Sequence, residues 1–307
     1  MEYESETSSE SISSNSHDTP PPPTLTDPPS ASSGEWRPCQ QYAPYRRERD
    51  TNTAPDAALT KPLKAADPAT LPGGKKSLAG VSIRSFILGQ VFGFSLLLTF
   101  LLLKLSNPLW RAPFFLTTLS LFHFLEYYLT AQYNTPYASI SAFLLSSNGA
   151  AYNLAHTSAL AECLLSRLFL PVRYIRWTSM AFGGVKVQIG LGLIFMVVGQ
   201  IVRSLAMRQA GTNFTHTIQS RRREGHTLVK EGIYSILRHP SYFGFFWWGL
   251  GTQLVLGNVV CFFGYAIVLW QFFSFRIKRE EKLLVGFFGK EYIDYREKTR
   301  VVIPFIS

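Results

Sequence analysis

Residues 242–275 read YFGFFWWGLGTQLVLGNVVCFFGYAIVLWQFFSF and contain no charged side chain. A membrane-spanning helix needs roughly 17 to 25 mostly apolar residues. The stretch holds two such runs, at about 242–257 and 259–275, and only Gly257 and Asn258 separate them. It therefore predicts a tight pair of helices whose outer ends meet at one face of a membrane.

Four more apolar runs precede this pair. The third is the weakest, because it carries His156, Glu162 and Arg167, and polar groups inside a bilayer are costly. No alternating strand pattern, internal repeat or phosphate-binding glycine loop accompanies the runs. The sequence therefore predicts an all-α, polytopic transmembrane helical protein of about six spans with a C-terminal helical hairpin. The four runs lie at about 82–103, 113–133, 150–170 and 187–207.

Small residues mark places where helices can approach one another. Gly190, Gly192 and Gly199 in the fourth run have spacings that permit close helix packing. Gly244 would let a ligand or a neighbouring helix come close, because glycine has no Cβ. We expect close contacts at these glycines.

The N-terminal part of the chain has a different composition. Residues 1–76 are rich in Ser, Thr, Pro, Asp and Glu, and the run at 20–23 is four consecutive prolines. Such a segment buries too little apolar surface to offset the entropy of ordering it. We therefore expect a disordered tail over 1–76 and a transmembrane domain over 77–307, with its chemistry concentrated in 208–307.

The charges indicate orientation rather than nucleic-acid binding. The chain has 307 residues and a net charge of +10, and many cations lie between or after the apolar runs, at 208–238 and 276–300. Cytosolic loops of membrane proteins carry such an excess of Lys and Arg, so both segments should be cytosolic. Six spans then place both termini in the cytosol, although Arg173 and Arg176 would fall on the other side. Three cysteines lie far apart without metal-binding spacing, so we expect no metal site.

A string of polar residues comes directly before the fifth run. It contains Tyr234, His239 and Tyr242, which can hydrogen-bond a polar ligand, and Pro240 suits the first turn of a helix. The exposed N–H groups of that turn can hold an anionic group. The alternative is an interfacial anchor of aromatic and basic side chains. We favour the anchor for the tryptophans at 247 and 248, but not for the ordered polar string.

A second motif follows the sixth run. Arg276 and Glu280 are four residues apart and share one helix face. A surface ion pair of this kind is common and weak. Their expected position across the hairpin from His239 favours a functional role instead.

Together these motifs resemble the isoprenylcysteine carboxyl methyltransferases. The resemblance rests on RHPSYFG at 238–244, on the arginine and acidic pair of 276–281, and on FFGKEY at 287–292. It extends upstream through AGTNFTH at 210–216 and HTLV at 226–229, and it includes FHFLEY at 122–127. Phospholipid N-methyltransferases and membrane sterol reductases carry related C-terminal regions, so these remain the alternative. A non-catalytic membrane tether that retains the fold is a third hypothesis.

The resemblance implies an enzyme of the endoplasmic reticulum membrane. It would transfer a methyl group from S-adenosylmethionine to the C-terminal carboxylate of a farnesylated or geranylgeranylated cysteine in CaaX proteins. Arg276 would bind that carboxylate. The residues implied for the methyl donor are Gln219, His226, Thr227, Leu228, Val229, Tyr234, His239, Pro240, Ser241, Tyr242 and Glu280. The oligomeric state is not indicated.

The chemistry of this reaction is simple. A carboxylate with a pKa of about 3.5 is already ionised at pH 7, so no general base and no metal is needed, and the enzyme has to align the reactants. His239 and Glu280 then serve as ligands for the donor. Two polar pairs within the apolar runs, His123 with Glu126 and His156 with Glu162, we assign to inter-helix hydrogen bonds, because neither is expected near the cytosolic pocket.

Overall fold

The computed structural model describes residues 67–145, 147–171, 173 and 179–306. Most of the predicted tail, residues 1–66, lies outside the described residues, as does Arg176. The end of that tail contains a short 3-10 helix, η2 (Pro68–Thr70), whose first turn is capped by Asp67.

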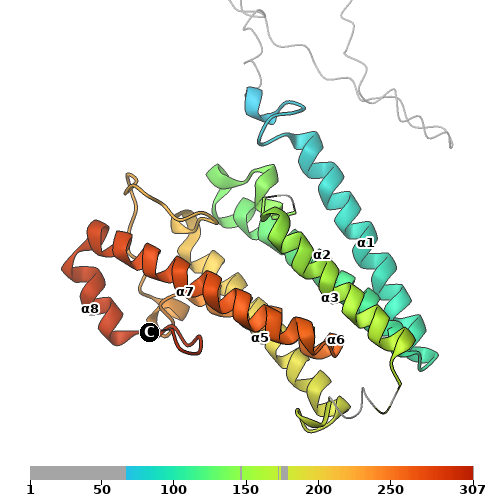
Figure 1. Ribbon diagram of the computed structural model, residues 1–307. Coiled ribbons are helices and arrows are strands. Elements are labelled where there is room, and N and C mark those ends of the chain that lie inside the picture. The colour runs from blue at the N-terminus through green and yellow to red at the C-terminus, as the bar shows by residue number, and fades with distance from the viewer. Residues whose placement is uncertain (1–66, 146, 172, 174–178, 307) are drawn as a thin grey trace, which may run out of the picture. The chain divides into compact units, whose positions relative to one another are not determined.

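The regular elements of the described residues are helices, accompanied by two isolated β-bridges (Figure 1). The prediction of an all-helical fold is therefore confirmed for this part of the chain. The α-helices are α1 (Leu78–Lys104), α2 (Arg111–Tyr133), α3 (Gly149–Phe169), α5 (Val185–Ala210), α6 (Pro240–Leu256), α7 (Val260–Phe288) and α8 (Lys290–Lys298). The further 3-10 helices are η3 (Pro108–Trp110), η4 (Thr135–Tyr137), η5 (Ile140–Phe143), η6 (Gly211–Asn213) and η7 (Gly232–Ser235).

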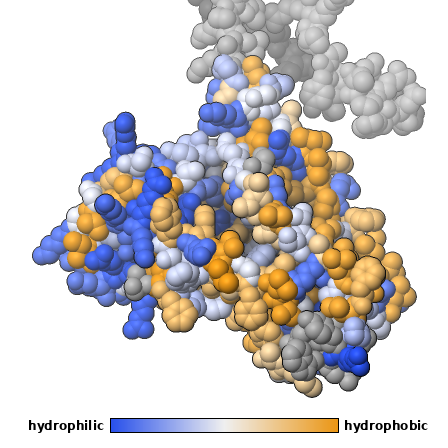
Figure 2. Space-filling model, in the orientation of Figure 1, coloured by the Kyte–Doolittle hydropathy of each residue, from blue (hydrophilic) through white to orange (hydrophobic). Residues whose placement is uncertain are grey.

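Three of the described helices are long and apolar enough to cross a membrane, namely Leu78–Lys104, Val185–Asn213 and Val260–Phe288. They expose large apolar side chains such as Phe94 and Leu97 in α1 and Phe275 in α7. Figure 2 shows hydrophobic side chains over the α1 side and hydrophilic ones over the α8 end. The chain is therefore a membrane protein, and the count of six spans stays a prediction.

Helix α7 is longer than the sequence pattern predicted. The apolar run ends at 275, yet the helix continues to Phe288 and ends at Gly289, which has a positive φ of 54°. Arg, Lys and Glu are good helix formers, and Ile277 keeps an apolar contact because it is 1% exposed. Arg276 and Glu280 therefore stand on a continuous extension of the sixth apolar run.

Helices α5 and α6 pack closely at two pairs of glycines. A Cβ added at Gly199 would lie 2.5 Å from the carbonyl oxygen of Gly244, and one added at Gly244 would lie 2.5 Å from that of Gly199. Gly192 and Gly251 form the second pair, at 2.8 and 2.7 Å. The expectation was wrong for Gly190, where an added Cβ meets nothing within 4 Å.

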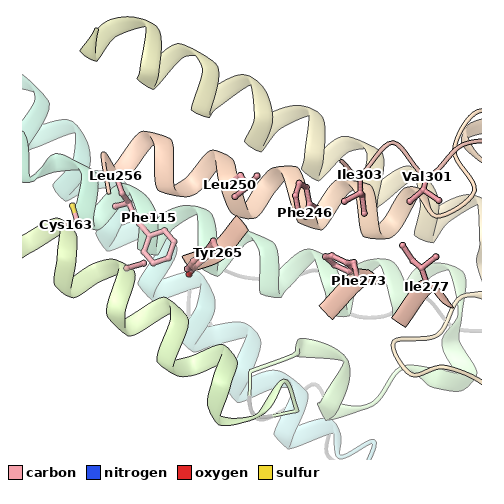
Figure 3. Packing of buried hydrophobic residues seen from close by; sticks show 11 residues of the cluster. Phe115, Cys163, Phe246, Leu250, Leu256, Tyr265, Phe273, Ile277, Val301 and Ile303 are labelled. Carbon is pink, nitrogen blue, oxygen red and sulfur yellow. The ribbon is translucent and has the colours of Figure 1, made fainter. Parts of the chain in front are cut away.

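The buried core follows α6 from end to end (Figure 3). Phe115 and Cys163 pack near Leu256 at the C-terminal end of α6, while Phe273 and Ile277 lie toward its start. Trp248 is also buried, 3% exposed, with its ring stacked on Phe122 at 4.6 Å between centroids. The interpretation of Trp248 as an interfacial anchor was therefore wrong.

The turn between α6 and α7 is held from α3. Gly257 ends α6 in the left-handed conformation, with φ of 74°. The carboxylate of Glu162 then accepts hydrogen bonds from the backbone N–H groups of Val259, Val260 and Cys261 at 2.7 to 2.9 Å. The assignment of Glu162 to inter-helix hydrogen bonding is thus confirmed.

The glycine contact leads to a test of stability. Gly199→Ala should lower the free energy of unfolding by about 1 to 3 kcal/mol, because its Cβ meets backbone atoms that cannot move aside. Gly190→Ala is the matched control on the same helix and should be neutral or slightly stabilising, because its Cβ meets open space. Thermal unfolding of the full chain in detergent measures both. Equal midpoints for the two variants would contradict the packing described.

Candidate active site

A cavity lies where the start of α6 meets α7, α8 and the segment after α5. Its empty space is about 730 Å³, which includes its open mouth. Both basic segments that the sequence analysis identified, 208–238 and 276–300, contribute residues to its wall. The lining residues are Ala210, Asn213, Phe214, Thr215, His226, Thr227, Leu228, Val229, Tyr234, Arg238, His239, Pro240, Ser241, Tyr242, Glu280, Leu284, Phe288, Tyr292 and Tyr295.

The structure brings together nearly all the residues expected at the methyl donor. Of these, Gln219 is the exception. It is absent from the cavity wall, and its amide nitrogen instead donates to Thr215 Oγ1 at 3.2 Å and the Thr217 carbonyl at 3.3 Å. Gln219 therefore braces the loop beside the cavity.

The first turn of α6 forms one wall because of its local sequence. His239 precedes the helix with non-helical backbone, φ −127° and ψ 64°, and Pro240 occupies the first position. Proline is favourable there, because its fixed φ suits the helix and the position needs no N–H donor. The His239 and Tyr242 rings then stack at 5.4 Å and 6°.

The hydroxyl of Tyr242 joins the two ends of the predicted Arg276 and Glu280 pair. It donates to Glu280 Oε2 at 2.5 Å and accepts from Arg276 Nε at 2.8 Å. The two charged groups of α7 are thus linked through a tyrosine of α6, in place of a direct surface ion pair.

Arg276 lies just beyond the cavity wall. Its Nη2 donates to the carbonyl of His216 at 2.6 Å, and its guanidinium lies over the rings of Tyr242 and Phe272 at 5.3 and 5.8 Å. Within the described part of the chain no group accepts a hydrogen bond from its Nη1. Arg276 is therefore oriented by three residues and keeps a donor for another ligand.

Glu281, the residue after Glu280, makes different contacts. Glu281 Oε1 accepts from Arg238 Nε at 2.6 Å and lies 3.2 Å from His239 Nε2. Arg238 also donates to the carbonyls of Arg296 and Thr299, both at 2.9 Å. Glu280 faces the cavity, whereas Glu281 joins α7 to the start of α6 and, through Arg238, to the C-terminal segment.

A buried ion pair supports the floor of the cavity. Glu126 of α2 is 1% exposed, and its Oε2 accepts from Arg203 Nη2 at 2.8 Å. Arg203 Nη1 donates to Ser241 Oγ at 2.9 Å, and Ser241 lines the cavity. The expectation that Glu126 lies away from the site was wrong, because α5 brings Arg203 between Glu126 and the start of α6.

Sequence reasoning missed Arg203, although a signal for it was present. An arginine inside an apolar run is a candidate functional group in its own right. In the structure its guanidinium lies over the rings of Phe122 and Phe245, at 5.5 and 5.4 Å from their centroids. His123 differs, since its Nδ1 pairs with the Phe143 carbonyl at 2.8 Å, as the inter-helix interpretation predicted.

Two polar atoms in the cavity wall have no partner. His226 Nδ1 and Tyr292 Oη are buried and make no hydrogen bond within the described residues. Burial, followed by the charges of Arg223 and Arg222, lowers the pKa of His226, so its ring is neutral at pH 7. Burial likewise raises the pKa of Tyr234, whose hydroxyl stays protonated. Buried polar atoms normally have partners, so this wall suits a ligand that carries several hydrogen-bonding groups.

Comparisons with known proteins identify the family. The model of the isoprenylcysteine carboxyl methyltransferase (ICMT) family matches residues 192–286. The protein-S-isoprenylcysteine O-methyltransferase of Saccharomyces cerevisiae is 43% identical over 76% of this chain and 93% of its own length. The chain belongs to the isoprenylcysteine carboxyl methyltransferase family. The human protein of the same name is 38% identical over 74% of this chain and 75% of its own length.

A solved structure supports this membership of the ICMT family. The intramembrane Ras methyltransferase ICMT of a eukaryote has a TM-score of 0.64 to this chain and 32% sequence identity. The match covers 74% of this chain and 77% of the solved one. The cavity at the start of α6 therefore belongs to a membrane-embedded member of a methyltransferase family.

The buried ion pair leads to the second test. Arg203→Gln should destabilise the protein by about 3 to 5 kcal/mol, because it leaves the Glu126 carboxylate buried without a counter-charge. Thermal unfolding in detergent measures the loss. Arg208→Gln on the same helix is the control, since Arg208 is exposed and should change little.

A double variant separates the ion pair from simple packing. Glu126→Gln with Arg203→Gln should recover part of the loss, because both charges are then absent. Additive losses would show that the pair is not coupled.

Proposed function

We propose that this chain transfers a methyl group from S-adenosylmethionine to the C-terminal carboxylate of a prenylated cysteine in CaaX-processed proteins. The observation that carries the proposal is the Tyr242 bridge. It places Arg276, at the edge of the apolar surface, beside a cavity wall suited to a polar ligand. The curated relatives are named protein-S-isoprenylcysteine O-methyltransferases, which supports this substrate class.

The cavity wall fits the methyl donor. S-adenosylmethionine, when bound, supplies a methyl group on a positively charged sulfur. The Glu280 carboxylate and the free His226 Nδ1 and Tyr292 Oη would meet its polar groups, and Leu284 and Phe288 would contact its apolar parts. His226 to Val229 would form one wall and His239 to Tyr242 the other.

Arg276 would hold the substrate carboxylate. A guanidinium binds carboxylates through paired hydrogen bonds, which fixes the direction of the oxygens. Phe272 and Phe275, 52% and 71% exposed on the same helix, offer an apolar path for the prenyl chain. Since the carboxylate is already ionised, these residues act by alignment, which supplies about 7 to 11 kcal/mol in favourable cases.

The placement in the cell follows from the same proposal. We infer six spans, with α2, α3 and α6 crossing beside the three long apolar helices, and with both termini in the cytosol. The basic segments at 208–238 and 276–300 support this orientation. The membrane would be that of the endoplasmic reticulum. Residues 77–307 would hold the whole activity; the match to the yeast relative has a similar length of 232 residues.

An assay of methyl ester formation tests the proposed function. Membranes that contain the full chain should methylate N-acetyl-S-farnesylcysteine with labelled S-adenosylmethionine as donor, because the thioether-linked prenyl group and free carboxylate are both present. A geranylgeranyl analogue reports the chain-length preference. Base-labile label confirms an ester. Label on phosphatidylethanolamine in place of the prenylcysteine would favour a phospholipid amine methyltransferase.

The role of Arg276 has a separate test. Arg276→Ala should raise the KM for the prenylcysteine and lower kcat at least about 100-fold, because the carboxylate loses its orienting partner. Binding of S-adenosylmethionine, measured by calorimetry on the purified chain, should change little. Arg279→Ala is the matched control, one turn along α7 and exposed. Equal loss of donor binding in Arg276→Ala would place Arg276 in the donor site instead.

A further inference from the structure

Two arginines meet at the end of α6 that is farther from the cavity. Arg111 begins α2, and Arg167 lies in the last turn of α3. A Cβ built on Gly257 would lie 2.5 Å from Arg111 Nη1 and 2.3 Å from Arg167 Nη2, so both guanidiniums approach one point. Because α6 has 17 residues and rises about 25 Å, this pair and the cavity lie at opposite ends of the helix.

These arginines have more donors than acceptors. Arg111 is 5% exposed, yet its Nε and Nη1 are buried without a hydrogen-bond partner, and so is Arg167 Nε. No carboxylate in the described residues forms a salt bridge with either arginine. Glu162, near Arg167 in the sequence, is occupied by the N–H groups that begin α7. Two adjacent cations, of which Arg111 is buried and Arg167 partly buried, are unfavourable without an anion.

The end of α6 explains part of this arrangement. Arg167 Nη2 donates to the Leu256 carbonyl at 3.0 Å, as expected for a cation at the negative end of a helix. That contact leaves the donors of Arg111 unpaired. No further acceptor for these donors lies among the described residues, so an acceptor from outside this part of the chain would satisfy them.

The surroundings indicate what kind of acceptor this is. Leu168, Phe169 and Val260, within three residues of Arg167 or Gly257 in sequence, are 59%, 74% and 75% exposed. Such apolar side chains in a membrane protein face acyl chains. An anion bound here would therefore carry acyl chains. The oxygens of a phosphate can accept hydrogen bonds from several guanidinium donors at once.

We propose that Arg111 and Arg167 bind the phosphate group of a membrane phospholipid at the α6–α7 turn. The phosphate would accept from the unpaired donors of Arg111, and the acyl chains would lie along the exposed apolar residues. The lipid would stabilise the junction of α2, α3, α6 and α7. The proposal does not depend on the methyl transfer, since the site lies at the other end of α6.

Thermal unfolding of the delipidated full chain in dodecylmaltoside tests the proposal. Added dioleoylphosphatidylglycerol should raise the Tm by about 3 to 6 °C at saturation. Dioleoylglycerol, which lacks the phosphate, should not raise it. Arg111→Gln should raise the lipid concentration needed for half of the Tm increase about tenfold, because the substitution removes charged donors and weakens binding. Lys186→Gln, at an exposed cation near the start of α5, should leave the response unchanged.

Several results would overturn the proposal. An equal rise in Tm with phosphatidylglycerol in Arg111→Gln and in the parent chain would show that Arg111 does not bind the lipid. The same rise in Tm with inorganic phosphate alone would show a free anion in place of a lipid. If Arg111→Gln does not fold, the lipid response is measured with Arg167→Gln instead. Native mass spectrometry of the parent chain then tests directly whether a phospholipid is bound. Absence of bound phospholipid from the native mass spectrum of the parent chain, purified without delipidation, would then contradict the proposal.

Discussion

The close contact between α5 and α6 fixes the positions of the groups around the cavity. Where Gly199 and Gly244 face each other, backbone approaches backbone, and a Cβ on Gly244 would also lie 2.8 Å from the Arg203 amide nitrogen. One helical turn beyond Gly199, Arg203 therefore stands beside the first turn of α6. A larger residue at either glycine would separate the helices and draw Arg203 away from Ser241.

From this contact a continuous set of interactions surrounds the site. Arg203 connects Ser241 to Glu126, and Glu126 Oε2 lies 3.6 Å from His216 Nδ1. The carbonyl of His216 accepts from Arg276, which donates to Tyr242, the residue after Ser241. These contacts form a closed ring of groups from α2, α5, α6, α7 and the segment after α5 that carries His216. A residue deep in the apolar region, such as Glu126, thereby influences where the arginine proposed to bind substrate is held.

Arginines at the two ends of α6 are in contrasting environments. Arg203, near its start, has a bidentate carboxylate and a serine, so its charge is satisfied by the chain. Arg111, near its end, is as deeply buried but has no such partner in the described residues. Burying a cation without a counter-charge is costly. The chain itself meets that cost for Arg203, and for Arg111 the lipid bilayer is the available source of an anion.

The sequence by itself determined the helical character and the approximate ends of most helices, and the family resemblance that it carries indicated much of the cavity wall. Apolar runs, Pro240 and the paired glycines act over a few residues, so their effect can be predicted from local pattern. It did not determine how far α7 extends, that Trp248 is buried, that Gln219 lies off the cavity, or that Arg203 pairs with Glu126. Those features depend on contacts between residues far apart in the chain, and the orientation of α5 against α2 and α6 decides them. The sequence shows that a charged residue lies in an apolar run, where burial is unfavourable. Which residue pairs with it depends on how the helices pack.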